Sequence, residues 1–171
     1  MLGDQLRRTD VSQRRERALQ HLDELAAVVP DAPELAEWVC HLAPEPWCGK
    51  GYWVHGDLYA RHVLVDEGRF AGLIDWGDTH HGDRATDLSA AFSLFDEADR
   101  ARFFAAYGAP LDDDMLARAR FRSLCSALAI IRYGQAVDDA PLFRAGLAAV
   151  LQPCAARLVA HQLQGRDHAD G

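Results

Sequence analysis

The sequence has little lysine, no closely paired cysteines and no long apolar run, and each absence excludes a class of protein. No apolar run approaches the roughly 20 residues of a membrane-spanning helix, so we expect no membrane partner. Cys40, Cys48, Cys125 and Cys154 form no CxxC pair, which favours free thiols in a reducing cytoplasm over a zinc site. Lys50 is the only lysine, and the formal net charge of −8 argues against a general nucleic-acid binder.

The remaining composition is that of a folded protein. The chain has 171 residues, of which 49% are hydrophobic, so we expect a single domain over 1–171 with a sizeable core. The tail at 165–171 is expected to be disordered, and residues 1–11 are expected to be frayed. An acidic surface attracts cations, which favours a cationic small molecule as the partner.

Apolar spacing predicts a mostly helical α+β fold. Helical periodicity covers 12–29 and 31–42, and a long helix is expected from Asp112 to about Gly134, with its middle in the core. The segment 76–84 shows no periodicity and is predicted as a loop. A small antiparallel β element is expected before it.

The stretch 54–75 carries the polar groups of greatest interest. Asp57 follows one short apolar run and Asp75 closes another, with a tight turn predicted at 66–68 between the second and third runs. The hairpin should bring both carboxylates to one opening. Two carboxylates that converge repel each other unless a cation lies between them or one is protonated.

Three motifs in this region resemble the aminoglycoside phosphotransferase family, whose fold is similar to that of protein kinases. The resemblance is carried by order and spacing over about forty residues. Its elements are His55-Gly56-Asp57 with His62 five positions later, Ile74-Asp75-Trp76-Gly77-Asp78, and Gly82-Asp83-Arg84-Ala85-Thr86-Asp87-Leu88-Ser89.

The resemblance implies transfer of the γ-phosphoryl group of ATP or GTP to a hydroxyl of a small molecule, such as an antibiotic, a sugar or an amino alcohol. Asp57 matches the catalytic Asp, and Asp75 matches the Asp that binds Mg²⁺. His62 stands where the family commonly has Asn, although a His is not foreign to its macrolide branch. His62 is therefore an auxiliary metal ligand, a partner of a phosphate oxygen or the mark of a decayed site.

Further residues are assigned supporting roles. The resemblance implies that His55 buttresses the catalytic loop and that Asp87 accepts hydrogen bonds from its backbone. Helix capping is an alternative for Asp87. The candidate substrate-binding residues are Tyr59, Asp78, His80 and Asp112, the last of which also suits a helix start.

The nucleotide-covering part of the kinase template is missing from the sequence. That template uses a glycine-rich loop and a strand lysine paired with a helix glutamate. Lys50 lies beside the catalytic segment and cannot be that lysine. We therefore expect the C-terminal lobe alone, from a truncated or degenerate member of the family, with a separate N-terminal lobe as one possible partner.

Two other functions stay open at this point. A kinase lobe that has lost its activity would be a binding module without catalysis. A metal-dependent hydrolase would use Asp57, His62, Asp75 and His80, because imidazoles and carboxylates together bind transition metals.

Overall fold

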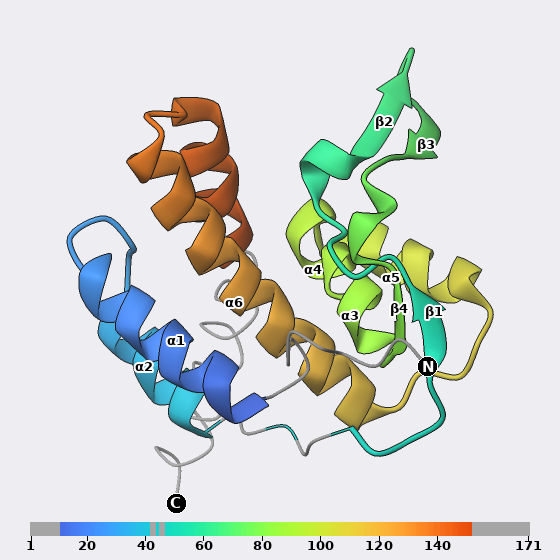
Figure 1. The fold of residues 1–171 in the computed structure, drawn as a ribbon, viewed down its shortest axis with the longest axis horizontal. Helices are drawn as coiled ribbons and strands as arrows, with labels where there is room; N and C mark the ends of the chain where they lie inside the picture. Colours follow the sequence, from blue (N-terminus) through green and yellow to red (C-terminus); the bar gives the residue numbers. More distant parts are fainter. Residues whose placement is uncertain (1–10, 42–43, 45–46, 152–171) are drawn as a thin grey trace, which may run out of the picture.

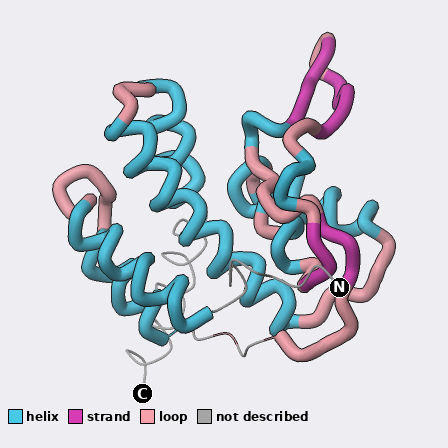
Figure 2. The backbone as a smooth tube through the Cα atoms, in the orientation of Figure 1, coloured by secondary structure: helices cyan, strands magenta, loops and turns pink. Residues whose placement is uncertain are grey.

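The computed structural model describes residues 11–41, 44 and 47–151, and shows a mostly helical chain with two small antiparallel sheets (Figures 1 and 2). The predicted tail at 165–171 and residues 1–10 of the predicted frayed segment lie outside the described residues. The helices are α1 (Val11–Glu24), α2 (Ala32–His41), α3 (Ala85–Leu88), α4 (Ala90–Leu94), α5 (Glu97–Tyr107), α6 (Asp113–Ala136) and a further helix over 140–151, with 3₁₀ turns η1 (Ala60–His62) and η2 (Trp76–Asp78). The strands are β1 (Tyr52–Val54), β2 (Val63–Asp66), β3 (Arg69–Leu73) and β4 (His80–Gly82).

Helix α6 is the spine of the molecule. It contacts α1 on one side and α3 and α4 on another, and Figure 1 shows it running between these two groups. Phe121, Leu124 and Leu128 of α6 are fully buried in a core shared with α1 and α2. The prediction that the middle of this helix lies in the core is confirmed, because a helix covered on several sides needs apolar residues on most of them.

Aspartate side chains cap the first turns of α5 and α6. The Asp96 side chain accepts a hydrogen bond from the Asp99 N–H at 2.9 Å, and Asp112 accepts one from the Met115 N–H at 2.7 Å. Each bond satisfies a first-turn amide that has no partner within its helix.

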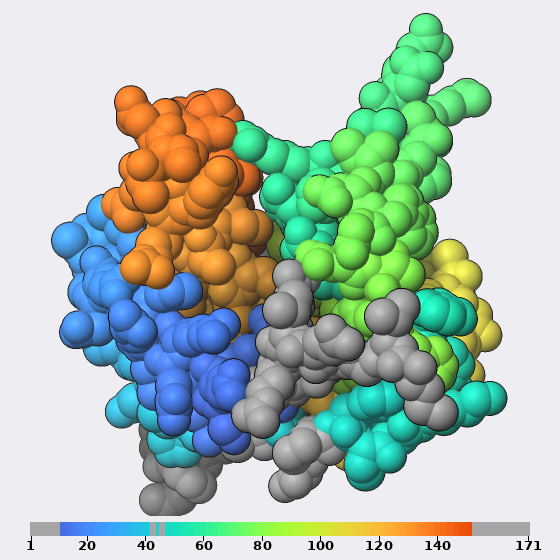
Figure 3. Space-filling model, in the orientation of Figure 1, coloured from blue at the N-terminus to red at the C-terminus, as the bar shows by residue number. Residues whose placement is uncertain are grey.

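The predicted hairpin is present as strands β2 and β3. Asp66 pairs with Arg69, which leaves Glu67 and Gly68 as a two-residue turn with positive φ at both positions. Such turns match the right-handed twist of the strands, and glycine adopts them without strain. Figure 3 shows the hairpin projecting from the body of the molecule.

The prediction of a loop over 76–84 is wrong in part. The segment contains η2 and strand β4, which pairs antiparallel with β1 through Val54 and His80. A three-residue strand is too short to show a period, and its partner lies far away in the sequence. A second apolar cluster joins α3, α4 and α6.

No helix in the described part of the chain combines the length and the apolar character needed to cross a bilayer.

Candidate active site

The loop after β1 presents Asp57 at the surface. Gly56 turns the chain with a φ of 90°, and a Cβ at this position would lie 2.3 Å from the carbonyl oxygen of Asp78. Only glycine allows both the turn and this approach. The Asp57 side chain is 53% exposed, so its carboxylate is accessible to a second molecule.

The side chain of Asp87 binds the backbone of this loop. Its two carboxylate oxygens accept hydrogen bonds from the backbone N–H groups of His55 at 2.8 Å and Gly56 at 3.0 Å. A carboxylate bonded to two successive amides restricts the backbone immediately before Asp57. Asp87 therefore positions Asp57 without approaching the exposed face of its carboxylate.

The buried side chain of His55 connects the segment of Asp57 to the segment of Asp75. The ring is 2% exposed, and its Nε2–H donates to the carbonyl oxygen of Ile74 at 2.8 Å. Its Nδ1 accepts the N–H of Asp57 at 3.4 Å, which is consistent with a neutral ring that carries its proton on Nε2. One buried side chain thus connects Asp57 to the residue before Asp75.

The hairpin register brings Asp75 next to His62. Val63 pairs with Leu73, and the N–H of Ile74 donates to the carbonyl oxygen of His62 at 3.0 Å, which extends the ladder by one step. Asp75 follows directly in a left-handed conformation, with φ 61° and ψ 60°. This conformation is uncommon for a residue with a side chain, and such outliers cluster at functional sites.

The ring of His62 lies between the two carboxylates. Its Nδ1 is 2.7 Å from the Asp57 carbonyl oxygen, which can only accept, so Nδ1 carries a proton. Nε2 faces Oδ2 of Asp75 at 3.4 Å, and Oδ2 of Asp57 lies 3.9 Å from Nδ1. In a neutral ring the lone pair of Nε2 would face the negative oxygen of Asp75, and the two would repel each other. A cation or a proton between them removes this repulsion.

The donor set is small for a metal cage. In the described segments, no group of three or more His, Cys, Asp and Glu residues is placed to hold a metal ion. The four-residue cluster that the hydrolase alternative requires is therefore not assembled among them. Mg²⁺ keeps several waters and is commonly held by one or two carboxylates together with substrate phosphates, so the Asp75 carboxylate fits this smaller requirement. Nε2 of His62 lies beside it as an auxiliary nitrogen donor, although Mg²⁺ prefers oxygen.

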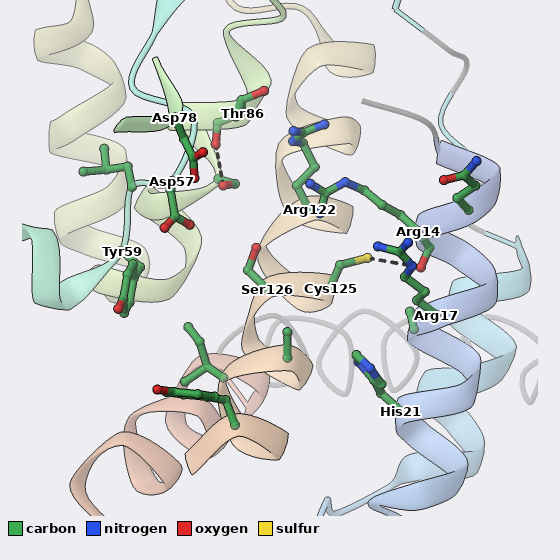
Figure 4. Close-up of a pocket in the computed structure, with 18 of the residues that line it drawn as sticks. Arg14, Arg17, His21, Asp57, Tyr59, Asp78, Thr86, Arg122, Cys125 and Ser126 are labelled. Carbon is green, nitrogen blue, oxygen red and sulfur yellow. Dashed lines mark hydrogen bonds between the residues drawn. The ribbon is translucent and has the colours of Figure 1, made fainter. Parts of the chain in front are cut away.

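A cavity of about 460 Å³ is lined by Asp57 and lies between the loop after β1, α1 and α6 (Figure 4). Two of the candidate substrate residues, Tyr59 and Asp78, line it together with Asp57. His62 and Asp75 do not. Asp57 therefore lines the cavity and also lies next to the ring of His62. Figure 3 shows the surface hollowed between the segment after α6 and the segment that includes β2.

Other lining residues come from helices far away in the sequence. Sequence reasoning missed Arg14, Arg17 and His21 on α1, and Arg122 on α6. Their helical spacing puts the three α1 side chains on one face, but no local pattern indicates which element that face meets. Cys125 also lines the cavity, and burial raises the pKa of its thiol to about 11, so it stays protonated at neutral pH.

The other two candidate substrate residues do not line this cavity. Asp112 caps α6. The Nδ1–H of His80 donates to the Asp78 carbonyl oxygen at 2.8 Å, and Nε2 is buried without a hydrogen-bond partner among the described residues. His80 thereby fixes the turn that carries Asp78.

Tyr59 packs its ring edge-on against His62, with 4.4 Å between the ring centroids. Burial and the negative charge of Asp57 raise the pKa of the Tyr59 phenol. The hydroxyl stays protonated at neutral pH as a result, and it can donate a hydrogen bond at the edge of the cavity.

Comparison with known proteins gives a consistent family. The model of the phosphotransferase enzyme family APH matches residues 3–122. An uncharacterized protein, YcbJ of Bacillus subtilis, is 37% identical over 62 residues, which is 36% of this chain and 20% of that protein.

Two solved structures resemble this chain over most of its length. A macrolide 2′-phosphotransferase type I has a TM-score of 0.49 and 22% identity, over 82% of this chain and 48% of the other. The gentamicin complex of APH(2″)-IIa has a TM-score of 0.45 and 18% identity, over 85% and 51%. The chain spans about half the length of these structures. The family match covers more than half of the present chain, and the chain therefore belongs to the APH phosphotransferase enzyme family.

Proposed function

We propose that this chain is the catalytic half of a small-molecule kinase, which transfers the γ-phosphoryl group of ATP or GTP to a hydroxyl in the cytoplasm, where these nucleotides are made. One observation carries the proposal beyond family membership. The Asp57 carboxylate lies at the junction between a cavity large enough for a small molecule and the pair formed by His62 and Asp75. A phosphoryl transfer needs the acceptor hydroxyl within reach of the base and the γ-phosphorus in line with the hydroxyl oxygen.

Asp57 orients the acceptor hydroxyl and takes its proton. The carboxylate is exposed, while its backbone is held by Asp87 and His55, so it is accessible without being mobile. Holding a base within hydrogen-bond reach of the reacting group lowers the barrier mainly by fixing its orientation.

Asp75 and Nε2 of His62 would hold Mg²⁺. When bound, this ion neutralises the charge of the nucleotide phosphates. The Nδ1–H of His62 donates to the Asp57 carbonyl oxygen, and this hydrogen bond leaves Nε2 as the ligand atom. The same bond couples the position of His62 to the catalytic loop.

A separate N-terminal lobe would cover the nucleotide. The β2–β3 hairpin and the residues after it expose a set of large apolar side chains, from 43% to 68% of their surface: Leu64, Val65, Phe70, Ile74 and Trp76. Contiguous exposed apolar groups mark surfaces that another protein segment covers.

The proposal is tested by measuring phosphoryl transfer from Mg²⁺–ATP and Mg²⁺–GTP to a panel of hydroxyl compounds, with the isolated chain and with an added nucleotide-covering lobe from a relative. Asp57→Asn should lower the rate by at least about 100-fold, because it removes the base. Asp66→Asn is the matched control, since Asp66 is an exposed hairpin carboxylate away from the site.

Two results would overturn the assignment. Equal rates for Asp57→Asn and Asp66→Asn would remove Asp57 from the reaction. Absence of any heat on titration with Mg²⁺–ATP, with the lobe added, would favour the non-catalytic binding module.

A further inference from the structure

An ion pair joins two walls of the cavity beside Asp57. Arg61 follows the loop that carries Asp57, and its guanidinium group binds the carboxylate of Asp139, which lies in the segment after α6. The two partners are 78 positions apart in the sequence. Figure 3 shows the segment around residue 60 meeting the segment after α6 at the edge of the hollow between them. We call the pair of Arg61 and Asp139 the bridge.

Each partner of the bridge adjoins residues that line the cavity. Tyr59 lies two positions before Arg61, and Leu142 lies three positions after Asp139; both line the cavity, as does Tyr133 near the end of α6. The Arg61 guanidinium is also close enough to the phenols of Tyr59 and Tyr133 to interact with both. The bridge therefore connects the wall that carries Tyr59 with the wall that carries Tyr133 and Leu142.

The Asp139 end of the bridge is held in place by its own helix. Oδ1 of Asp139 accepts the N–H of Leu142 at 2.9 Å, which caps the helix that follows and leaves Oδ2 for Arg61. That hydrogen bond and the Arg61 guanidinium lower the pKa of Asp139, so its carboxylate is ionised at neutral pH. The helix packs closely on α6, because a Cβ on Gly134 would lie 2.8 Å from the backbone nitrogen of Phe143.

The Arg61 end belongs to the turn that carries Tyr59 and His62. The N–H of His62 donates to the carbonyl oxygen of Tyr59 at 2.9 Å, and the two rings pack edge-on. The ring of His62 ties this turn to the backbone of Asp57. Because the Arg61 side chain is half exposed, the bridge contributes little to the stability of the whole fold. Its effect is therefore expected in the position of the turn.

We propose that the bridge positions Tyr59 for the phosphoryl acceptor, and that Arg61 thereby helps to determine how tightly the acceptor binds. This inference rests on the proposed function. With the bridge formed, Tyr59 stays at a fixed distance from Tyr133, and an acceptor between the two walls meets Asp57 in the same cavity. With the bridge broken, Tyr59 takes several positions and the acceptor binds more weakly. Arg61 acts through Tyr59 and is a positioning residue.

Fluorine NMR of the full chain labelled with fluorotyrosine measures the bridge without nucleotide or acceptor. The four tyrosines give separate signals, which are assigned by replacing each tyrosine singly with phenylalanine. Arg61→Gln should shift or broaden the Tyr59 signal. Asp139→Asn should do the same, because asparagine keeps the helix cap and removes the charge. Arg61→Lys retains the charge and should restore most of the wild-type signal. About 1 M NaCl should move the wild-type signal as Arg61→Gln does, since salt screens exposed pairs.

Arg102→Gln is the matched control, because it breaks an exposed ion pair with Asp99 on α5. This variant should leave the Tyr59 signal unchanged. The proposal is overturned if Arg61→Gln moves the Tyr59 signal no more than Arg102→Gln does. It is also overturned if the effects of Arg61→Gln and Asp139→Asn add in the double variant, because two partners of one pair cannot act independently.

Kinetic measurements with the best acceptor of the panel test the consequence for binding. Arg61→Gln should raise the KM for the acceptor about threefold, as expected for loss of an exposed ion pair, and should change kcat by less than about twofold. An unchanged acceptor KM, or a rise confined to the KM for Mg²⁺–ATP, would overturn the assignment to the acceptor. If no compound is phosphorylated, the proposed function fails and the acceptor assignment fails with it, whereas the tyrosine signals still decide whether the bridge positions Tyr59.

Discussion

At the scale of single residues, the site is organised by side chains that hydrogen-bond to the backbone of Asp57 and of the two residues before it. Asp87 bonds the two amides before it, His55 bonds its N–H, and His62 bonds its carbonyl. The Asp57 carboxylate is thereby left exposed while the chain that carries it is fixed on both sides. Positioning of this kind is effective because the rate of transfer depends steeply on the orientation of the reacting groups.

Asp87→Ala should destabilise the protein by about 2 kcal/mol or more, because it leaves two partly buried amides without acceptors. The free energy of unfolding measured in urea checks this. Asp87→Asn, which retains one acceptor oxygen, should fall between Asp87→Ala and the wild type. Equal stability of Asp87→Ala and the exposed control Asp66→Ala would contradict the positioning role.

At the scale of elements, the β2–β3 hairpin does two things. The register of its two strands places Asp75 next to His62. Its surface exposes the side chains of Val65 and Phe70. The first property depends on backbone hydrogen bonds alone, so the exposed side chains are not needed for the geometry of the site. They are available for contact with another lobe.

Phe70→Ser should change the free energy of unfolding by less than about 0.5 kcal/mol, because Phe70 is 68% exposed. The same substitution at Phe121, which is 1% exposed, should cost about 3 kcal/mol or more. Urea denaturation measures both changes.

Phe70→Ser should also reduce concentration-dependent self-association in sedimentation experiments, because it removes part of an exposed apolar surface. A large loss of stability in this variant would show that the hairpin packs against the body of the protein and is not free to accept another lobe.

At the scale of the whole molecule, a buried ion pair links the segment just before α3 to α6. Nε of Arg118 on α6 donates to Oδ2 of Asp83 at 2.7 Å, and Oδ1 of Asp83 accepts the N–H of Ala85. Both side chains are largely buried. The pair therefore fixes α3, and with it Asp87, relative to α6 and the cavity.

Asp83→Asn should destabilise the protein by about 3 kcal/mol, because it leaves the Arg118 guanidinium buried beside a neutral partner. A double-mutant cycle with Arg118→Gln measures the coupling, since the second substitution should cost much less in the Asp83→Asn background. Additive effects would mean that the two residues stabilise the fold independently.

Local sequence patterns were sufficient for much of the fold. The hairpin turn at Glu67 and Gly68, the helix start at Asp112 and the core position of α6 each depend on chemistry within a few residues, and each was predicted. Strand β4 was not, because its pairing with β1 joins short segments that are distant along the chain. The roles assigned to Asp57, His62 and Asp75 stay predictions, although the structure brings the three side chains together.

The sequence by itself determined which residue types stand at the ends of the strands, since strand ends, turns and helix caps are local properties. Only the tertiary structure decided which nitrogen of His62 faces Asp75, and that Arg14, Arg17 and Arg122 meet opposite Asp57. The physical reason is that a ring orientation or a cavity wall depends on how separate elements pack, and helix periodicity identifies a face without identifying its neighbour.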